Sequence, residues 1–225
     1  MTVHVSYDGR SSSDRIIVDR STGRSYAGQS ADERDAQRRA RLRAAGREII
    51  GTQGYAASTI ERICTTAKVS TRHFYQLYGT KEDAFIDVYD EITRESYDRV
   101  LASLAETAGG RLEDRIPAAM LAYLTPMVED RRVARIAFVE IMGASPRIEK
   151  LRLEYRETLI ALVDNEGTAA VKRGEIAPRD FRFAALALVG ATTAIVYDWM
   201  LRRDRSSIQQ LEKAIVDLAV DLLTH

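Results

Sequence analysis

The stretch STIERICTTAKVSTRHFYQLYGTKEDAF, residues 58–85, decides the fold of this chain. Ser58 or Thr59 can cap a first short helix by accepting hydrogen bonds from its free backbone N–H groups. Ser70 or Thr71 can cap a second, very short helix in the same way, and a glycine ends that helix. Two short helices joined by a tight turn, the second bearing hydroxyl, guanidinium, imidazole and phenol groups, predict a helix-turn-helix that places one helix in the major groove of DNA.

Helices are predicted on both sides of this motif. Upstream, Leu42 and Ile49 belong to an apolar face that predicts a helix over residues 32–53. Downstream, Thr80 and the acidic residues after it mark a helix start, and the helical pattern continues until two glycines end it after residue 108. This long helix would connect a three-helix head to the rest of the chain.

The rest of the chain keeps a helical pattern. Further helices are predicted over residues 112–127, 131–143, 146–173, 178–203 and 206–224. Pro178 is expected in the first turn of its helix. Ile136, Val139 and Met142 are expected to face inward from theirs. No alternation of period two indicates a strand, and no segment repeats.

The predicted fold is therefore all-α, in three parts. These are a flexible N-terminal arm over residues 1–31, a three-helix helix-turn-helix DNA-binding domain over residues 32–80, and a helical effector-binding and dimerisation bundle over residues 81–225. The arm mixes Gly, Ser, Arg and Asp, a composition that favours mobility. Its arginines could instead follow phosphates or a minor groove, although Asp8, Asp14 and Asp19 cancel much of that charge.

Composition excludes several classes of protein. The chain has 225 residues with 33 basic and 33 acidic side chains, so any contact with nucleic acid would have to be local. Its single cysteine, Cys64, excludes an internal disulfide and fits a reducing cytoplasm. No apolar run suggests a signal peptide or a membrane span, so a cytoplasmic protein without membrane contact is predicted.

The helix-turn-helix segment also carries a family resemblance. The positions that carry it are Leu42, Ala45, Ile50, Gly54, Tyr55, Thr59, Ile63, Ala67, Val69, Ser70, Phe74, Tyr75, Tyr78, Lys81 and Phe85. With this spacing the chain resembles the TetR (tetracycline-repressor-like) family of bacterial transcription regulators. Two positions depart from the family pattern, because Lys68 and Arg72 stand where glycine is common. A lysine with positive φ would strain the turn, and Arg72 adds a cation that would alter which bases are read.

The resemblance implies a function. It implies a DNA-binding regulator, a repressor in most cases, that a small-molecule effector releases from its operator and that needs no cofactor. It also implies a homodimer on palindromic double-stranded DNA, with groove helices about 34 to 36 Å apart. Effector binding would shift the long helix after residue 80 and so change the separation of the groove helices.

Candidate DNA contacts fall into three groups. A groove helix reads bases near its N-terminus, which selects Ser70, Thr71, Arg72 and His73. The resemblance adds contacts to the DNA backbone from Thr59, Tyr75 and Lys81. The arginine-rich helix before the motif adds Arg38 and Arg41 as phosphate contacts. Arg72 could bind a guanine edge or a phosphate, and Gln76 could face DNA or solvent.

The last two predicted helices are apolar on most of their surface. Small side chains on one and a seam of aliphatic side chains on the other favour dimerisation through a four-helix bundle, as the resemblance also implies. The predicted interface residues are Ala187, Ala191, Ile208, Leu211, Ile215, Leu218 and Leu222. The alternative is a buried helix pair within a monomer.

Bulky and adaptable side chains in the C-terminal part are candidates for an effector cavity. They are Met120, Tyr123, Met127, Phe138, Met142, Tyr155, Leu159 and Trp199. Each of them could instead pack in the core. The absence of an evident charged pocket favours an apolar or amphipathic effector.

Enzymatic readings have little support in the sequence. The three histidines are His4, His73 and His225, whose positions cannot form a metal site at ligand spacing, and no phosphate loop or nucleophile motif occurs. Glu140 is expected to pair with a neighbouring cation such as Arg135, Arg152 or Arg156, although such a residue can also orient a ligand. We therefore predict no enzyme and no metal site. The alternatives are a helical scaffold that uses its N-terminal domain for protein contacts, and a helical enzyme that depends on Glu140.

Overall fold

The computed structural model describes residues 30–202 and 206–224, and the regular structure of these residues is entirely helical. The elements are α1 (Ala31–Gln53), α2 (Ile60–Ala67), α3 (Thr71–Leu77), α4 (Lys81–Glu106), α5 (Leu112–Val128), α6 (Arg131–Arg135), the π-helix η1 (Ile136–Glu140), α7 (Pro146–Lys172), α8 (Phe181–Leu201) and α9 (Ile208–Thr224). The all-α prediction is confirmed. The predicted arm lies outside the described residues, apart from Ser30 and Ala31, which begin α1.

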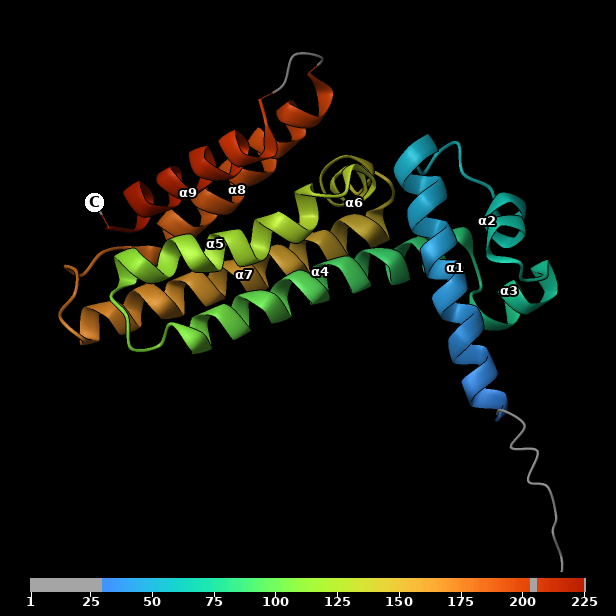
Figure 1. Cartoon of the computed structure of the whole chain (residues 1–225), viewed down its shortest axis with the longest axis horizontal. Helices are drawn as coiled ribbons and strands as arrows, with labels where there is room; N and C mark the ends of the chain where they lie inside the picture. Colours follow the sequence, from blue (N-terminus) through green and yellow to red (C-terminus); the bar gives the residue numbers. More distant parts are fainter. Residues whose placement is uncertain (1–29, 203–205, 225) are drawn as a thin grey trace, which may run out of the picture.

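Helices α1, α2 and α3 form a head at one end of the molecule, with α2 and α3 on the side of α1 away from the helical body (Figure 1). The side chain of Thr59 caps α2 by accepting from the backbone N–H of Arg62. The side chain of Ser70 caps α3 by accepting from that of His73. The head has its own apolar core, in which Phe74 is fully buried. These caps and this core give the predicted helix-turn-helix.

Lys68 ends α2 in the left-handed conformation, with φ 54° and ψ 44°. It is the one non-glycine residue with positive φ among the described residues. A Cβ atom in this region clashes with the following carbonyl at a cost of about 1 to 2 kcal/mol. The turn of the motif therefore closes with a lysine, and it carries the strain that the sequence predicted.

Replacing Lys68 by glycine is expected to raise the free energy of unfolding by about 0.5 to 1 kcal/mol, because relief of the Cβ clash exceeds the entropy that glycine adds to the unfolded chain. Urea denaturation followed by circular dichroism measures the change. Lys68→Ala is the matched control, since it removes the same charge and keeps the Cβ. An equal gain from alanine would assign the effect to charge instead of backbone strain.

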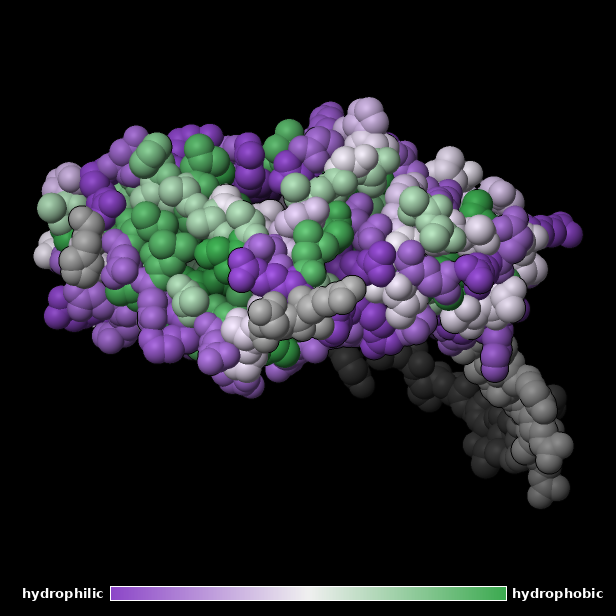
Figure 2. Space-filling view, turned by 90° about the horizontal axis from the view of Figure 1, so that it is seen from above, coloured by the Kyte–Doolittle hydropathy of each residue, from purple (hydrophilic) through white to green (hydrophobic). Residues whose placement is uncertain are grey.

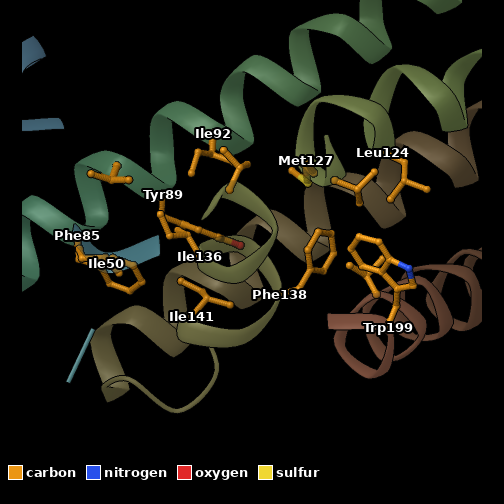
Figure 3. Packing of buried hydrophobic residues seen from close by; sticks show 14 of the residues in the cluster. Ile50, Phe85, Tyr89, Ile92, Leu124, Met127, Ile136, Phe138, Ile141 and Trp199 are labelled. Carbon is orange, nitrogen blue, oxygen red and sulfur yellow. The ribbon is translucent and has the colours of Figure 1, made fainter. Parts of the chain in front are cut away.

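The body is built along α4, which leaves the head and runs beside α5 and α7 to the opposite end of the molecule, while α8 and α9 cover the other side of α5 and α7 (Figure 1). The largest core cluster crosses from head to body. It includes Ile50 of α1, Phe85 of α4, Phe138 of η1 and Trp199 of α8 (Figure 3). Because one apolar cluster contains residues of both parts, the head cannot tilt without repacking this core.

The segment after α6 departs from the predicted helix. The backbone N–H of Ile141 donates to the carbonyl of Ile136 at 3.2 Å, an i to i+5 bond that defines a π-turn. The wider turn shifts the inward stripe, so Phe138 and Ile141 are buried while Met142 is 46% exposed. The predicted inward stripe is therefore wrong at Met142, because it assumed 3.6 residues per turn.

Helix α8 also begins later than predicted. The side chain of Asp180 accepts from the backbone N–H of Phe183 and caps the helix, so Pro178 lies before the first turn and not in it. Among the described residues, α8 is the one helix long and apolar enough by length and composition to cross a membrane. The sequence had predicted no membrane-spanning stretch.

Candidate DNA-contact surface and effector cavity

Helix α3 presents its polar side chains away from the head core. Thr71 and Arg72 are exposed, and Tyr75 is 58% exposed with its ring edge against Phe74. His73 is half-buried, and a ring nitrogen lies 2.9 Å from the Ser70 hydroxyl, which also caps the helix. The predicted base-contacting residues thus occupy one end of α3, with Arg72 free of any ion pair within the described part of the chain.

The arginine-rich face of α1 divides into two sets. Three of its arginines bind carboxylates of α4, namely Arg39 with Asp87, and Arg43 and Arg47 with Glu91. Of the two predicted phosphate contacts, Arg38 pairs with Asp35 at 2.6 Å, and Arg41 is exposed without an ion pair among the residues described. About half of the arginines on this face therefore hold α1 to α4. The sequence pattern alone could not distinguish these arginines from arginines that face DNA.

Lys81 is directed into the protein. Its ammonium donates to the carbonyls of Tyr55 and Ser58, each at 2.9 Å. It also lies 4.4 Å from the centroid of the Tyr55 ring. Two of the three ammonium hydrogens therefore bind carbonyls of the protein, and the expected phosphate contact of Lys81 remains a prediction for the third. Lys81 joins the start of α4 to the turn before α2.

A second polar contact joins this turn to the body. The Glu140 carboxylate of η1 accepts from the backbone N–H of Tyr55 at 2.8 Å and from Nε of Arg135 at 2.8 Å. Arg135 also donates to the carbonyl of Thr52 at 2.8 Å. The predicted ion pair of Glu140 is thus confirmed, with Arg135 as its partner. The bond to Tyr55 has no signal in the sequence, because the two residues are far apart along the chain.

Gly54 makes this close approach possible. It ends α1 with φ 91°, a conformation that favours glycine. A Cβ at this position would lie 2.8 Å from Nη2 of Arg135 and 3.1 Å from Oε1 of Glu140. The glycine therefore leaves room for the ion pair to sit against the end of α1.

A small cavity, with about 60 Å³ of free volume, lies between α4, α5, η1, α7 and α8. Its wall is mainly apolar, and η1 supplies Phe138 to it. Its polar lining residues are four tyrosines, three threonines, and Arg152 and Arg156 of α7. Arg152 pairs with Glu149 at 2.6 Å. Arg156 pairs with Glu157 at 3.5 Å, while its buried Nε has no partner among the described residues. The arrangement suits a mostly apolar molecule with an acidic or strongly polar end.

Phenols complete the polar part of the wall. Burial raises the pKa of Tyr123 to about 12. Burial also raises the pKa of Tyr155, whose hydroxyl donates to Asp90 of α4. Both groups therefore stay neutral at physiological pH and offer hydrogen bonds without adding charge.

The structure brings most of the predicted effector residues to this cavity. Those lining it are Tyr123, Met127, Phe138, Met142, Tyr155 and Leu159. Met120 lines two neighbouring cavities. Trp199 lines none of these three cavities, because it is buried in the core with its indole N–H donating to the carbonyl of Ser206 at 2.8 Å. The prediction for Trp199 is therefore corrected to a core role.

Sequence reasoning missed the arginines of this cavity. Arg152, Tyr155, Arg156 and Leu159 follow one another at helical spacing, so they lie on one face of α7. The sequence did contain a signal for a cavity with a polar end, because two arginines stand next to large apolar residues on one face of this helix. From the sequence these arginines were expected only as possible partners of Glu140, which instead pairs with Arg135.

Two protein-family models match the chain. A model for bacterial regulatory proteins of the tetR family matches residues 42–88. A model for the tetracyclin repressor-like C-terminal domain matches residues 109–223, which is more than half of the chain. The chain belongs to the TetR family. It is a DNA-binding regulator of transcription that responds to a ligand.

Individual relatives and solved structures are also similar to this chain. The fatty acid metabolism regulator protein of Bacillus subtilis (strain 168) is 20% identical over 174 residues, which cover 77% of this chain and 89% of that protein. The fatty acid degradation regulator FadR of Bacillus halodurans matches with a TM-score of 0.74 at 18% identity, covering 84% of this chain and 97% of that one. FadR of Bacillus subtilis, solved with stearoyl-CoA, matches with a TM-score of 0.73 at 19% identity, covering 80% and 97%.

In this TetR-family chain, α8 and α9 are the helices predicted to form the dimer interface. The residues that they expose differ from the predicted interface residues. Leu211 and Ile215 are buried in the core of their own chain, so they are corrected from interface to core positions. Ala187, Ala191, Ile208, Leu218 and Leu222 are half-buried. The exposed apolar side chains of α8 are instead Phe183, Leu186, Tyr197 and Leu201. Figure 2 looks down on α8 and α9 and shows a hydrophobic area over them.

The described part of this TetR-family chain offers little support for a metal site or a reactive thiol. In residues 30–202 and 206–224, no group of three or more His, Cys, Asp or Glu side chains could hold a metal ion. Cys64 is buried, and burial raises the pKa of its thiol. A thiol with a raised pKa is a poor nucleophile at neutral pH. The relatives reported above are regulators and not enzymes.

Proposed function

We propose that this chain is a cytoplasmic homodimer that binds a palindromic operator and leaves it when a long-chain acyl compound, such as an acyl-CoA, enters the cavity beside η1. It acts by binding alone, without catalysis. The observation that carries this proposal is that η1 lines the cavity with Phe138 and contacts the head with Glu140. A molecule entering the cavity meets the same short segment that holds the DNA-binding head.

The chemistry of the cavity supports an acyl effector. Apolar side chains would cover an alkyl chain, and Arg152 and Arg156 would meet an anionic head group. Two neighbouring cavities share lining residues with this one or with each other, so apolar space continues along α5, α7 and α8. The Bacillus subtilis relative with stearoyl-CoA binds a molecule of this kind.

Release would follow from a movement of η1. Phe138 is 3% exposed and belongs to the same core cluster as Ile50 of α1, so a ligand that displaces its ring would repack a cluster that extends into the head. A shift of η1 moves Glu140, which holds the backbone of Tyr55 and the side chain of Arg135. The head would then tilt, and the two groove helices of a dimer would no longer match their half-sites.

Stearoyl-CoA is expected to weaken operator binding at least about fivefold, the lower end of typical coupling between two sites. Fluorescence anisotropy of labelled duplex from upstream of the gene measures the dissociation constant with and without the compound. Coenzyme A alone and Arg156→Gln serve as controls, since one lacks the alkyl chain and the other lacks a cation at the cavity. Unchanged affinity at saturating stearoyl-CoA would contradict the proposed effector class.

The exposed face of α8 supports the homodimer. Phe183, Leu186, Tyr197 and Leu201 stand at steps of three, eleven and four residues, about one, three and one turns of helix, with the small residues Gly190 and Ala194 between them. An apolar stripe of this length costs free energy while it faces water, and small residues allow close helix approach. A second copy related by a twofold axis would cover the stripe with its own.

Replacing Leu186 by aspartate is expected to raise the dissociation constant of the dimer at least about tenfold, because it places a charge in an apolar contact. Sedimentation velocity over a concentration series measures it. Leu121→Asp is the matched control, since Leu121 of α5 is 39% exposed and outside α8 and α9. Equal behaviour of the two variants would show that the α8 stripe does not form the interface.

A further inference from the structure

The carboxylate of Asp87 on α4 joins this helix to α1 and to the end of α3. It accepts a hydrogen bond from the hydroxyl of Tyr78, the residue that follows α3 and caps it. It also pairs with two arginines of α1, namely Arg39 at 3.4 Å and Arg43 at 3.8 Å. Its side chain is 19% exposed. Neither the predicted DNA contacts nor the proposed release through η1 uses Asp87.

Tyr78 is the firmly held partner in this junction. It is 4% exposed and belongs to the apolar core of the head, so its ring cannot turn away. Burial, with the bond to Asp87 as a second cause, raises the pKa of Tyr78 well above its ordinary value, so the hydroxyl remains a donor at physiological pH. The Arg39 side chain is 40% exposed, so its ion pair with Asp87 is weakened by water. The bond between Tyr78 and Asp87 is therefore the contact that fixes the end of α3 against α4.

Helix α3 depends on such contacts for its direction. It has seven residues, too few to be stable alone, and it lies on the side of α1 away from the body (Figure 1). The buried ring of Phe74 holds its middle. At its last turn Arg39 donates to the carbonyl of Leu77 at 3.3 Å, and the Arg39 guanidinium lies 4.8 Å from the centroid of the Tyr78 ring. The contacts at Tyr78 therefore set the direction in which α3 points from Phe74.

An open cleft borders this junction. Its free volume is about 360 Å³, and Arg39, Tyr78 and Asp87 are among the residues that line it. Because solvent reaches the cleft, water can hydrate these polar groups if the bond between Tyr78 and Asp87 is lost, so the head can stay folded. Water cannot tie α3 to α4, however. Loss of this bond is therefore expected to give a freer α3 in a folded protein.

We propose that Asp87 is a positioning residue for sequence recognition, which holds the Tyr78 hydroxyl and so fixes α3 in the direction that brings its first turn to the base edges. This inference rests on the proposed contact of α3 with an operator. Contacts with base edges carry the sequence preference, whereas contacts with phosphates supply most of the affinity for unrelated DNA. A loosely held α3 therefore lowers the affinity for the operator and leaves the affinity for unrelated DNA unchanged.

Asp87→Asn is expected to lower the preference for the operator over an unrelated duplex at least about fivefold, because the amide lacks the charge that strengthens the bond from Tyr78. Tyr78→Phe removes the same bond and keeps the pair of Asp87 with Arg39, so a similar loss is expected. The double variant is expected to lose no more than the larger single loss. Fluorescence anisotropy with duplex from upstream of the gene and with an unrelated duplex measures the preference. At each salt concentration the affinity for the unrelated duplex is expected to equal that of the wild type.

Glu91→Gln is the matched control. Glu91 lies one turn further along α4 and pairs with Arg43 at 3.2 Å and Arg47 at 3.0 Å, but it has no hydrogen bond or ion pair to α3 among the described residues. This variant is expected to keep the wild-type preference. An equal loss in Glu91→Gln and Asp87→Asn, or a loss of affinity for both duplexes alike, would overturn the positioning role. So would a wild-type preference in Tyr78→Phe, which decides the matter if Asp87→Asn does not fold.

Amide hydrogen exchange of the full chain tests the junction without DNA. The backbone N–H of Tyr78 donates to the carbonyl of Phe74 at 2.8 Å, at the end of α3. In Asp87→Asn and Tyr78→Phe this end is expected to exchange at least about fivefold faster, with no change in α9. Unchanged exchange at α3, or equal acceleration in α9, would overturn the proposal. If the wild-type chain has no preference for the upstream duplex, the proposed operator is wrong, and exchange alone decides whether Asp87 fixes α3.

Discussion

Replacing Arg72 by alanine is expected to weaken operator binding by about 30-fold to 10⁴-fold. A bidentate contact between arginine and a guanine edge contributes about 1 to 3 kcal/mol of discrimination, and a dimer makes the contact twice. Arg72 lies in the first turn of α3, exposed and without an ion pair among the described residues, so no protein contact has to break before it meets DNA.

The measurement is an electrophoretic shift, or anisotropy, with duplex from upstream of the gene, repeated at several salt concentrations. Arg94→Ala is the matched control, because Arg94 is also exposed but lies on α4 and pairs with Asp90. If Arg72 contacts a phosphate, the salt slope of binding falls by about 1.8 for the two copies, and discrimination between sequences changes little. Equal losses in the two variants would remove α3 from the DNA surface.

The head could be predicted in detail because its signals are local. A cap is decided by a hydroxyl and the N–H group three residues later, so Thr59 and Ser70 were among the caps named from the sequence. The strain at Lys68 followed in the same way from one position in a turn. Local chemistry of this kind does not depend on what the rest of the chain does.

The body was harder to predict because its details depend on contacts between distant segments. The π-turn at η1 brings Phe138 and Ile141 inward, and no helical periodicity encodes the change of turn. Leu211 and Ile215 follow the same spacing as an interface seam would, and only the fold shows that they face α5 and α8 instead of a partner. An amphipathic pattern identifies a buried face without identifying what buries it.

The same limit applies to charged residues. Arg39, Arg43 and Arg47 belong to a basic run that resembles a DNA-facing surface, yet their carboxylate partners lie on α4. Lys81 likewise belongs to a family pattern for phosphate contact, yet it binds carbonyls of the turn before α2. Charge along one helix is visible in the sequence, whereas the neutralising group on another helix is not.

The contact between η1 and the head leads to the other large expected effect. Glu140→Gln is expected to reduce the release of DNA by stearoyl-CoA, removing about 1 to 3 kcal/mol of coupling, or about 5-fold to 150-fold in the affinity ratio. Glutamine keeps the size of the side chain but loses the charge that holds Arg135 and strengthens the bond from the Tyr55 N–H. The Glu140 side chain is 15% exposed, so water cannot readily replace these bonds.

The quantity to measure is the ratio of operator dissociation constants with and without saturating stearoyl-CoA. Glu48→Gln is the matched control, because Glu48 of α1 pairs with Arg132 of α6 across the same junction, but both side chains are 44% exposed. An exposed pair contributes about 0 to 1 kcal/mol, so this variant should retain nearly full release. Should Glu140→Gln also retain full release, the effector would have to act on the head by another route, such as the apolar cluster of Ile50 and Phe138.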